Sequence, residues 1–382
     1  MKLMHLADLH LGKRVNGFSM MEDQEYILNR ILEIMEEEQP DGLLIAGDVY
    51  DKTIPPAEAV RLMDDFLTAV AAKNVPVFLI SGNHDSAERV AFGHQLMQGS
   101  GIWISPVYDG TIRHHTLEDR WGEVNIYLIP FLRPSVVRSF FPDAEIGDYT
   151  DALGTILEGL QLDTSQRNVV LAHQFVVAAG ALPETCDSEQ LSVGGLDRVD
   201  GSVFSPFDYT ALGHLHGPQR VGSETIRYAG SPLKYSFSEL HQKKSVTVAE
   251  LREKGVTEIR QIPLQPRREM IELRGTFEEI LEEARKKGEP RTDYYHMILT
   301  DETDVVDALS RLREYYPNIM LLDYDNRRTR SQKEVEQMDR VEERTPGELF
   351  AALYEQQNGQ EMDSDRKEYL DGLIREIWEE QV

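Results

Sequence analysis

The segment Val-Pro-Val-Phe-Leu-Ile-Ser-Gly-Asn-His-Asp, residues 75–85, joins a short apolar run to a polar loop. The run at 75–80 has the length and composition of a buried β-strand. The loop carries an amide, an imidazole and a carboxylate at Asn83, His84 and Asp85. Because Asn and Asp also close ordinary turns, this loop alone is a weak sign of a functional site. The remainder of the chain decides its meaning.

Short apolar runs alternate with amphipathic stretches on the N-terminal side of this segment. Strands are predicted at 3–7 and 42–46, a helix at 57–73, and another helix from about Tyr26 to Pro40. This alternation is typical of a parallel sheet covered by helices. Later apolar runs predict further strands of the sheet, the last two as antiparallel additions, at 124–129, 169–172, 209–212, 226–229 and 245–251.

Five predicted strands end in loops that carry potential metal ligands. Open α/β sheets place their sites at the carboxyl ends of strands, so five such loops in series indicate one shared site. The donors are oxygen and imidazole nitrogen without thiolate, namely Asp8, His10, Asp48, Asn83, His173, His214 and His216.

This set of donors predicts a pair of metal ions. Oxygen and imidazole ligands suit manganese, iron or zinc better than calcium, and seven side chains are too many for one ion with an open position. Two ions about 3.5–4 Å apart can clamp the attacking and leaving oxygens of a displacement at phosphorus. Phosphoester hydrolysis is therefore the predicted reaction.

The composition limits the possible functions. The 382 residues are 41% hydrophobic and 28% charged, with a formal net charge of −27. Such an acidic chain is not expected to bind a polyanion over its whole surface, although a nuclease with metal ions and local arginines remains compatible. Cys186 is the single cysteine, which excludes an intrachain disulfide. No leader or membrane-spanning run is recognisable, so a cytoplasmic protein without membrane contact is expected.

A change in composition near residue 266 predicts a second domain. Strand, helix, strand, helix and strand follow one another between residues 270 and 322 without ligand-type loops. Thr276 and Glu279 have the spacing of a capping box at the first of these helices. The predicted division is a domain at 1–265, a small domain at 266–326, a charged linker at 327–344 and a helical hairpin at 345–382.

The linker and the hairpin can each be interpreted in two ways. The basic patch of the linker could be a solvated connector, which we favour, or a DNA-backbone contact; it consists of Arg327, Arg328 and Arg330. The hairpin has apolar stripes that two short helices cannot bury alone, so it docks back or, as we favour, binds a partner. The stripes include Phe350, Leu353, Leu373 and Trp378.

The order of the ligand loops resembles the calcineurin-like metallophosphoesterase family. The loops read Asp-x-His, Gly-Asp-x-x-Asp, Gly-Asn-His-Asp, a lone His and Gly-His-x-His, and the pattern spans residues 1 to about 260. Within that family, the segments 4–12, 82–89 and 230–239 resemble the bacterial nucleases that repair DNA double-strand breaks. The resemblance implies an α/β fold in which a β-sandwich is flanked by helices, with a small βαβαβ capping domain for DNA recognition and a C-terminal helical hairpin.

The resemblance also implies roles for individual residues. His84 would protonate the leaving ribose oxygen or stabilise its charge, and Asp51 would orient His84. Archaeal and eukaryotic relatives carry His where Asp51 stands, which leaves open a second role of this position in placing DNA. Manganese is the implied metal, with Asp8, His10, Asp48 and His216 around one ion and Asp48, Asn83, His173 and His214 around the other.

The implied function is a manganese-dependent exo- and endonuclease acting at DNA ends on the nucleoid, in repair and recombination. An SMC-like ATPase would receive the hairpin, and a homodimer built from helices near 56–98 would form within a heterotetramer. Lys13, Arg14 and Arg89 are candidate phosphate contacts; Arg89 could equally pair with Asp85, which is expected to cap the following helix. Alternatives are a small-substrate phosphodiesterase or protein phosphatase of the same family, and a DNA-tethering module.

Overall fold

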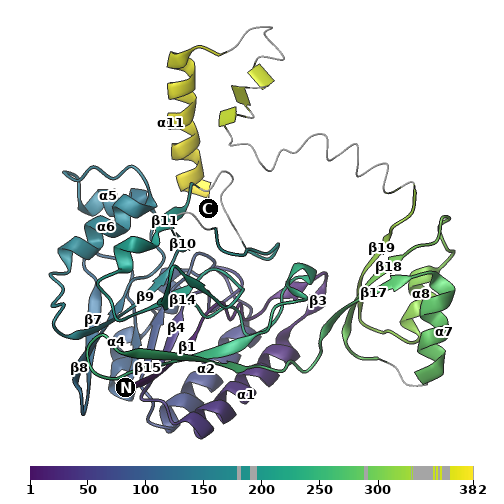
Figure 1. The fold of residues 1–382 in the computed structure, drawn as a ribbon, viewed down its shortest axis with the longest axis horizontal. Coiled ribbons are helices and arrows are strands. Elements are labelled where there is room, and N and C mark those ends of the chain that lie inside the picture. Colours follow the sequence, from purple (N-terminus) through teal and green to yellow (C-terminus); the bar gives the residue numbers. More distant parts are fainter. Residues whose placement is uncertain are drawn as a thin grey trace. The chain divides into compact units, whose positions relative to one another are not determined.

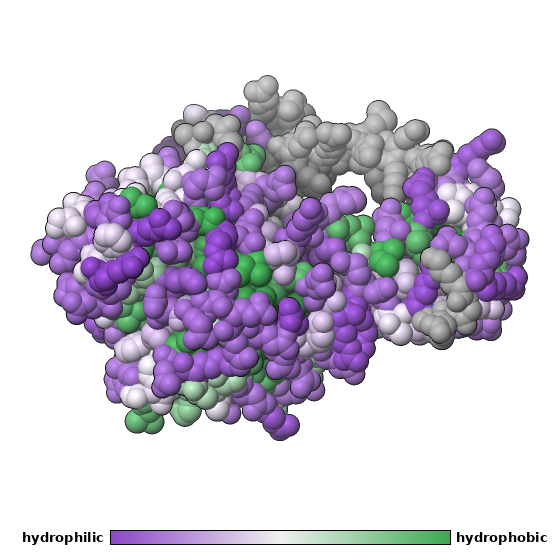
Figure 2. All heavy atoms as spheres, turned by 60° about the horizontal axis from the view of Figure 1, so that its bottom comes forward, coloured by the Kyte–Doolittle hydropathy of each residue, from purple (hydrophilic) through white to green (hydrophobic). Residues whose placement is uncertain are grey.

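The computed structural model describes residues 1–178, 182–189, 196–287, 291–327, 329, 347–348, 350–351, 353–354 and 362–381. The chain forms two compact units, the first from Met1–Val15, Ser19–Gln190 and Asp197–Arg267 and the second mainly from Arg268–Val382. Within the described ranges, no helix is long and apolar enough to cross a membrane. The surface in view in Figure 2 is predominantly hydrophilic, in keeping with the charged composition.

The first unit contains two six-stranded sheets that face each other (Figure 1). In the first sheet the order is β16-β15-β1-β4-β5-β6. Its last four strands are parallel, β15 is antiparallel to β1, and β16 is antiparallel to β15. The strands are β1 (Lys2–Leu6), β4 (Gly42–Ala46), β5 (Val77–Ile80), β6 (Ile102–Ile104), β15 (Ser245–Leu251) and β16 (Thr257–Pro263).

The second sheet has the order β13-β14-β12-β9-β8-β7, with four parallel inner strands between two antiparallel edges. Its inner strands were predicted to extend the first sheet, which is wrong. The run predicted as an antiparallel addition near 226 pairs parallel to β12, whereas β15 is antiparallel to β1 as predicted. The strands are β7 (Arg113–Asp119), β8 (Gly122–Leu128), β9 (Arg167–His173), β12 (Tyr209–Gly213), β13 (Gln219–Val221) and β14 (Ser223–Tyr228).

Helices cover the outer faces of both sheets, which confirms the predicted sandwich flanked by helices (Figure 1). On α1, Ile27, Ile31 and Ile34 are buried, because their spacing places them on one helical face. The helices and minor elements are α1 (Met21–Glu38), α2 (Ala57–Ala72), α3 (Ala87–Val90), α4 (His94–Met97), α5 (Pro134–Phe140), α6 (Tyr149–Gly159), β2 (Arg14–Val15), β3 (Phe18–Ser19), β10 (Phe175–Val177) and β11 (Arg198–Asp200).

Apolar side chains from both sheets meet in one core. Leu3, Leu44 and Phe78 of the first sheet belong to the same buried cluster as Val169 and Tyr209 of the second. All five residues of β4 are buried, because the strand is covered on both faces. This packing brings the carboxyl ends of the parallel strands of both sheets to the same region of the unit.

The second unit confirms the predicted βαβαβ pattern. Its three strands are parallel in the order β17-β18-β19, and its helices bury Phe277 and Leu312 against them. The capping box is formed, since Thr276 N–H donates to Glu279 Oε2 at 2.8 Å and Glu279 N–H donates to Thr276 Oγ1 at 3.3 Å. The elements are β17 (Met270–Gly275), α7 (Phe277–Lys287), β18 (Tyr294–Leu299), α8 (Ala308–Arg313) and β19 (Ile319–Tyr324).

The C-terminal prediction is covered only in part. Helix α11 (Ser364–Gln381) is described, and it carries Leu373, which is partly buried. Phe350 is 53% exposed and Leu353 is 49% exposed. Arg328, Arg330, most of the predicted linker and the side chain of Trp378 lie outside the described residues. The division into linker and hairpin stays a prediction.

Candidate metal centre

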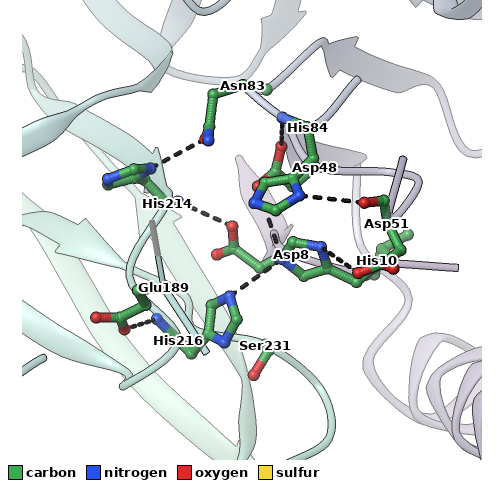
Figure 3. Close-up of polar contacts among 12 residues, drawn as sticks. Asp8, His10, Asp48, Asp51, Asn83, His84, Glu189, His214, His216 and Ser231 are labelled. Atoms are coloured by element: carbon green, nitrogen blue, oxygen red, sulfur yellow. Dashed lines mark hydrogen bonds and ion pairs between the residues drawn. The ribbon is translucent and has the colours of Figure 1, made fainter. Parts of the chain in front are cut away.

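The predicted ligands come from both sheets and meet at the carboxyl ends of their strands (Figure 3). The first sheet supplies the residues that follow β1, β4 and β5, and the second supplies the residues at the ends of β9 and β12. The structure brings together all the predicted ligands: Asp8, His10, Asp48, Asn83, His173, His214 and His216.

One group of donors surrounds His10. The ligand atoms of Asp8, His10 and His216 lie within 4.8 Å of one another. The Nε2 atoms of His10 and His216 are 3.0 Å apart, and His10 Nε2 is 3.6 Å from Asp48 Oδ2. Two imidazole nitrogens that face each other in this way can bind a single ion between them.

A second group surrounds His173. His173 Nε2 is 3.4 Å from Asp48 Oδ2 and 3.0 Å from Asn83 Oδ1, and His214 Nδ1 is 3.1 Å from the same Asn83 oxygen. Asp48 therefore lies between the His10 group and the His173 group. This is the position that a carboxylate shared by two ions requires.

Several buried atoms of the site lack a hydrogen-bond partner among the described residues. They are Asp8 Oδ2, His10 Nδ1 and His214 Nε2. Burial, opposed by His173 but reinforced by the Asp48 carboxylate, raises the pKa of Asp8 well above its ordinary value. A buried carboxylate oxygen without a partner is costly, and a divalent cation among these donors would satisfy Asp8 Oδ2. The donor set thus fits the metal ions that the sequence predicts.

The orientation of His173 also suits a metal ligand. His173 Nδ1 lies 2.8 Å from the Ala46 carbonyl, so Nδ1–H donates there and Nε2 faces Asp48 and Asn83. Burial acts to lower the pKa of His173, but the Asp48 carboxylate outweighs it and raises this pKa to about 9. A cation at Nε2 competes with a proton, so binding becomes tighter as the pH rises.

Four of the predicted ligands have a backbone conformation that non-glycine residues seldom adopt. Their φ angles are 53° at Asp8, 45° at His10, 48° at Asp48 and 105° at His214. Each costs on the order of 1–3 kcal/mol, and such strain is concentrated at functional sites. The Asp48 carbonyl accepts the His10 N–H at 3.0 Å and helps to hold this conformation. A side chain at Gly82 would place Cβ 2.2 Å from Asp48 Oδ1, so glycine is required there.

Comparison with known proteins identifies the family. The model for calcineurin-like phosphoesterases matches residues 1–218, and the model for the type 5 capsule protein repressor C-terminal domain matches residues 266–358. The SbcD component of the nuclease SbcCD from Staphylococcus epidermidis is 33% identical over 98% of this chain and 99% of its own length. This chain belongs to the SbcD family of calcineurin-like phosphoesterases. The same component from Staphylococcus saprophyticus is 34% identical over 84% of each chain.

Two solved structures are more distant from this SbcD-family chain. The match to a dimetal phosphatase from Danio rerio includes 69% of this chain and 99% of the phosphatase chain, at 11% identity and a TM-score of 0.40. The phosphoesterase Yfce from E. coli covers 69% with all of its own chain, at 15% identity and a TM-score of 0.29. These scores are too low to add support. Family membership makes the chain a metal-dependent phosphodiester hydrolase.

Asp85 does not cap the helix that follows it, contrary to the prediction. Its carboxylate accepts main-chain N–H groups of Val49 at 3.0 Å, Tyr50 at 2.9 Å and Gly82 at 2.9 Å. Ser86 is the N-cap of α3, since its Oγ accepts the Arg89 N–H. Asp85 therefore ties the ligand loop after β5 to the ligand loop after β4. Burial, together with the charge of Asp48, raises the pKa of Asp85 to about 6.

This correction leads to a test of stability. Asp85→Ala should lower the free energy of unfolding by several kcal/mol, since each of the three orphaned donors costs about 1–3 kcal/mol. Ser86→Ala, the matched control, should cost only about 1 kcal/mol as the loss of a helix cap. Urea unfolding followed by circular dichroism compares the two. If the two variants lost equal free energies of unfolding, Asp85 would contribute no more than a helix cap does.

His84 lies beside Asp51, but the contact differs from the prediction. The His84 Nδ1 atom is 3.1 Å from the main-chain carbonyl of Asp51, and the His84 N–H donates to Asp48 Oδ1 at 2.9 Å. The Asp51 carboxylate instead pairs with Lys13 Nζ at 2.7 Å and lies 3.8 Å from His10 Nδ1. The Asp51 carboxylate is occupied by Lys13. The group of Asp51 that can orient His84 is therefore its main-chain carbonyl (Figure 3).

The candidate phosphate contacts differ in their surroundings. Lys13 pairs with Asp51, and its ammonium lies 5.5 Å from the centre of the Tyr235 ring. Arg14 and Arg89 are exposed. Within the described part of the chain, no carboxylate pairs with the Arg89 guanidinium, so the pairing with Asp85 is wrong. Arg327 lies 3.8 Å from Glu302 and is 91% exposed. A phosphate contact by any of them stays a prediction.

Sequence reasoning missed the residues that support the ligands from behind. Gln24 Nε2 donates to the His10 carbonyl at 2.7 Å, and the Tyr235 hydroxyl donates to the Leu9 carbonyl at 2.5 Å. Other supporting residues surround His216 and come from two segments distant in sequence, namely Ser188, Glu189, Glu239 and Lys244. The only signal for any of them was the resemblance of segment 230–239 to SbcD-family nucleases.

Proposed function

We propose that this chain is the nuclease component of an SbcCD-type complex, a manganese-dependent exo- and endonuclease that hydrolyses phosphodiester bonds at DNA ends in repair and recombination. The single observation that carries the proposal is the continuous cluster of buried oxygen and imidazole donors, with Asp48 between its two halves. The Staphylococcus relatives are named as components of the nuclease SbcCD, which supports DNA as the substrate and SbcC as the partner.

Two divalent ions bound at this site would polarise the phosphate and activate water for in-line attack. Asp8, His10, Asp48 and His216 would hold one ion, and Asp48, Asn83, His173 and His214 would hold the other. These ligands suit manganese, iron or zinc, and manganese is the proposed metal because the resemblance to the family implies it. Asp48 Oδ2 lies 3.6 Å from His10 Nε2 and 3.4 Å from His173 Nε2, which allows it to serve both ions.

His84 is the proposed general acid. Its Nδ1–H is held on the Asp51 carbonyl, which leaves Nε2 to face a substrate. The side chain is only half-buried, so a phosphodiester can reach it. Protonated at Nε2, His84 would donate to the leaving ribose oxygen or stabilise the charge that develops there.

A substrate comparison tests the proposal. The full chain, stripped of metal and reloaded with manganese, should degrade linear double-stranded DNA, with and without the SbcC-type ATPase. Hydrolysis of a small chromogenic phosphodiester serves as the comparison. If the chain hydrolyses the small ester and leaves linear DNA intact even with the ATPase present, it is a small-substrate phosphodiesterase or phosphatase of the family.

The partner surface is proposed to lie near the C-terminus. Phe350 and Leu353 are each about half exposed, which leaves both side chains available to a partner. We place the binding site for the ATPase there, together with Leu373 and Trp378. A homodimer within the heterotetramer is proposed through segment 56–98, where Phe92 is 82% exposed.

Charge substitution tests the partner surface. Phe350→Asp combined with Leu353→Asp should abolish co-purification with the ATPase, because a carboxylate in an apolar interface is strongly disfavoured. Manganese-dependent hydrolysis of short single strands should remain within about twofold of the wild type, because these residues are remote in sequence from the metal ligands. Val306→Asp, at a side chain 79% exposed on the second unit, is the matched control. Co-purification of the double variant would assign the partner surface elsewhere.

A further inference from the structure

We propose that Ser188 and Glu239 are positioning residues that fix the His216 imidazole with its Nε2 available to the ion shared with Asp8 and His10. The inference rests on the proposed metal centre and adds to it a hydrogen-bonded chain from segments 186–189 and 230–244. The two ends of this contact are buried, since His216 is 1% exposed and Glu239 is fully buried, whereas Ser188 between them is half-buried.

Lys244, at one end of this hydrogen-bonded series, determines which atom donates and which accepts in every hydrogen bond of the series. The Lys244 ammonium can only donate, and its Nζ lies 2.5 Å from Glu239 Oε2. The Glu239 carboxylate can only accept, so the Ser188 hydroxyl, 2.6 Å from Oε1, donates to it. The Ser188 oxygen must then accept the proton of His216 Nδ1, 2.7 Å away. His216 is thereby held as the Nδ1–H tautomer.

The opposite side of the ring faces the predicted metal. With Nδ1 protonated, the lone pair of a neutral imidazole is on Nε2, which lies 3.0 Å from His10 Nε2. A metal ligand whose second nitrogen donates to an oxygen acceptor is fixed in tautomer and ring orientation. The Ser188–Glu239 pair supplies this acceptor for His216, as the Ala46 carbonyl does for His173.

The backbone of His216 is fixed by the same two segments. Its N–H donates to Glu189 Oε1 at 2.6 Å, and its carbonyl accepts from Lys244 Nζ at 2.8 Å. Glu189 Oε2 in turn accepts the Cys186 N–H at 2.9 Å. Hydrogen bonds therefore reach His216 at its ring, its amide and its carbonyl, all from residues outside the ligand loops.

Glu239 remains charged in this arrangement although it is buried. Lys244, which is 5% exposed, compensates its charge directly. Lys244 also donates to Ser231 Oγ at 2.9 Å and to Gln242 Oε1 at 2.7 Å, so the ammonium is fully engaged. A compensated buried pair of this kind can hold a hydroxyl in one orientation, because both ends of the chain are anchored.

The test measures metal binding by the full chain without DNA. After removal of metal by a chelator, manganese is titrated by calorimetry and electron paramagnetic resonance. Ser188→Ala should weaken binding of one of the two ions by about 10–100-fold, as loss of a hydrogen-bond partner behind a ligand does, and leave the other unchanged. Ser188→Thr, which keeps the hydroxyl, should bind both ions as the wild type does.

A control variant separates positioning from packing of the segment. Ser238 Oγ accepts the Asp187 N–H at 3.0 Å and is exposed. Ser238→Ala therefore loosens the same segment without removing the acceptor of His216, and it should bind both ions normally. If Ser188→Ala binds both ions normally while its Tm in chelator falls, Ser188 is only structural and the inference is wrong. If the wild type binds fewer than two ions, the proposed dimetal function fails instead.

Discussion

His84→Gln should reduce the rate of DNA hydrolysis by about 10²–10⁴-fold while both manganese ions and DNA remain bound. Glutamine can still contact the Asp51 carbonyl, but it cannot supply a proton to a leaving oxygen. The His84 ring is not among the proposed ligands, so metal affinity should be retained. Single-turnover cleavage at saturating manganese measures the rate, and calorimetry and fluorescence anisotropy measure metal and DNA binding.

The chain offers a matched control for this variant. His94 is also half-buried, and its Nδ1 lies 2.9 Å from the Ala91 carbonyl, but it is not part of the site. His94→Gln should leave cleavage within about twofold of the wild type. Turnover of His84→Gln that stays within tenfold of the wild type at saturating manganese would remove His84 from the acid role.

Asp51 should be far less critical than His84. The atom that contacts His84 Nδ1 is the main-chain carbonyl, which Asp51→Asn retains. The variant loses the charge that pairs with Lys13 and lies 3.8 Å from His10 Nδ1; the side chains of Lys13 and Asp51 are each 13% exposed. We expect a decrease in cleavage of no more than about tenfold, consistent with the modest contribution of a partly exposed ion pair. A loss as large as that of His84→Gln would show that the carboxylate itself takes part in the reaction.

Asp8→Asn should abolish most of the activity and yet raise the Tm of the metal-free protein. The folded-state pKa of Asp8 is raised by burial, opposed by His173, and further raised by Asp48. A carboxyl group with a raised folded pKa favours folding while protonated. This contribution is lost as the pH rises above the unfolded value of about 3.9. At neutral pH burial disfavours the charged Asp8 carboxylate, and the uncharged amide of Asp8→Asn does not carry this cost.

With manganese bound, the wild type should have the higher Tm and Asp8→Asn the lower. The wild type gains about 2.7 kcal/mol of stability when manganese is at 100 times its Kd, and Asp8→Asn should gain much less. Melting curves between pH 4 and 8, with chelator and with manganese, give both comparisons. Asp64→Asn on the exposed face of α2 is the control and should change neither. A lower Tm for metal-free Asp8→Asn would contradict the account of Asp8 as a penalty relieved by a cation.

The sequence predicted which polar side chains would lie together, because they belong to a repeated local pattern. Each follows a short apolar strand, and parallel strands end at a common edge, so position along the chain translates into position in space. The observed bounds of β4, Gly42–Ala46, are those predicted, because all five residues are buried and belong to one apolar run. The capping box of Thr276 and Glu279 was equally readable, because it depends only on residues three apart.

The assignment of strands to sheets could not be read in the same way. β9 and β12 are buried throughout, so they lack the alternation that would reveal which face meets another sheet. Nothing within β14 indicates whether it runs parallel or antiparallel to β12. These choices depend on packing between segments far apart in sequence.

Local sequence was misleading at Asp85 and silent at Ser188. Asp before Ser-Ala-Glu-Arg has the form of a helix cap, but the neighbouring Ser86 takes that role, which leaves Asp85 to bind three main-chain N–H groups. Ser188 lies between two acidic residues, a setting typical of a surface loop. Its contact with Glu239 joins residues 51 positions apart, and no local pattern encodes it.

The division of the site between two sheets has a consequence during protein synthesis. His10 and His216 face each other across 206 positions of sequence, and β1 completes its pairing only with β15, which ends at Leu251. A ribosome that adds about 5–20 residues per second takes on the order of 10–50 s to reach that strand. Until His214 and His216 have been made, the growing chain holds only the other five predicted ligands, so the donor cluster cannot be complete.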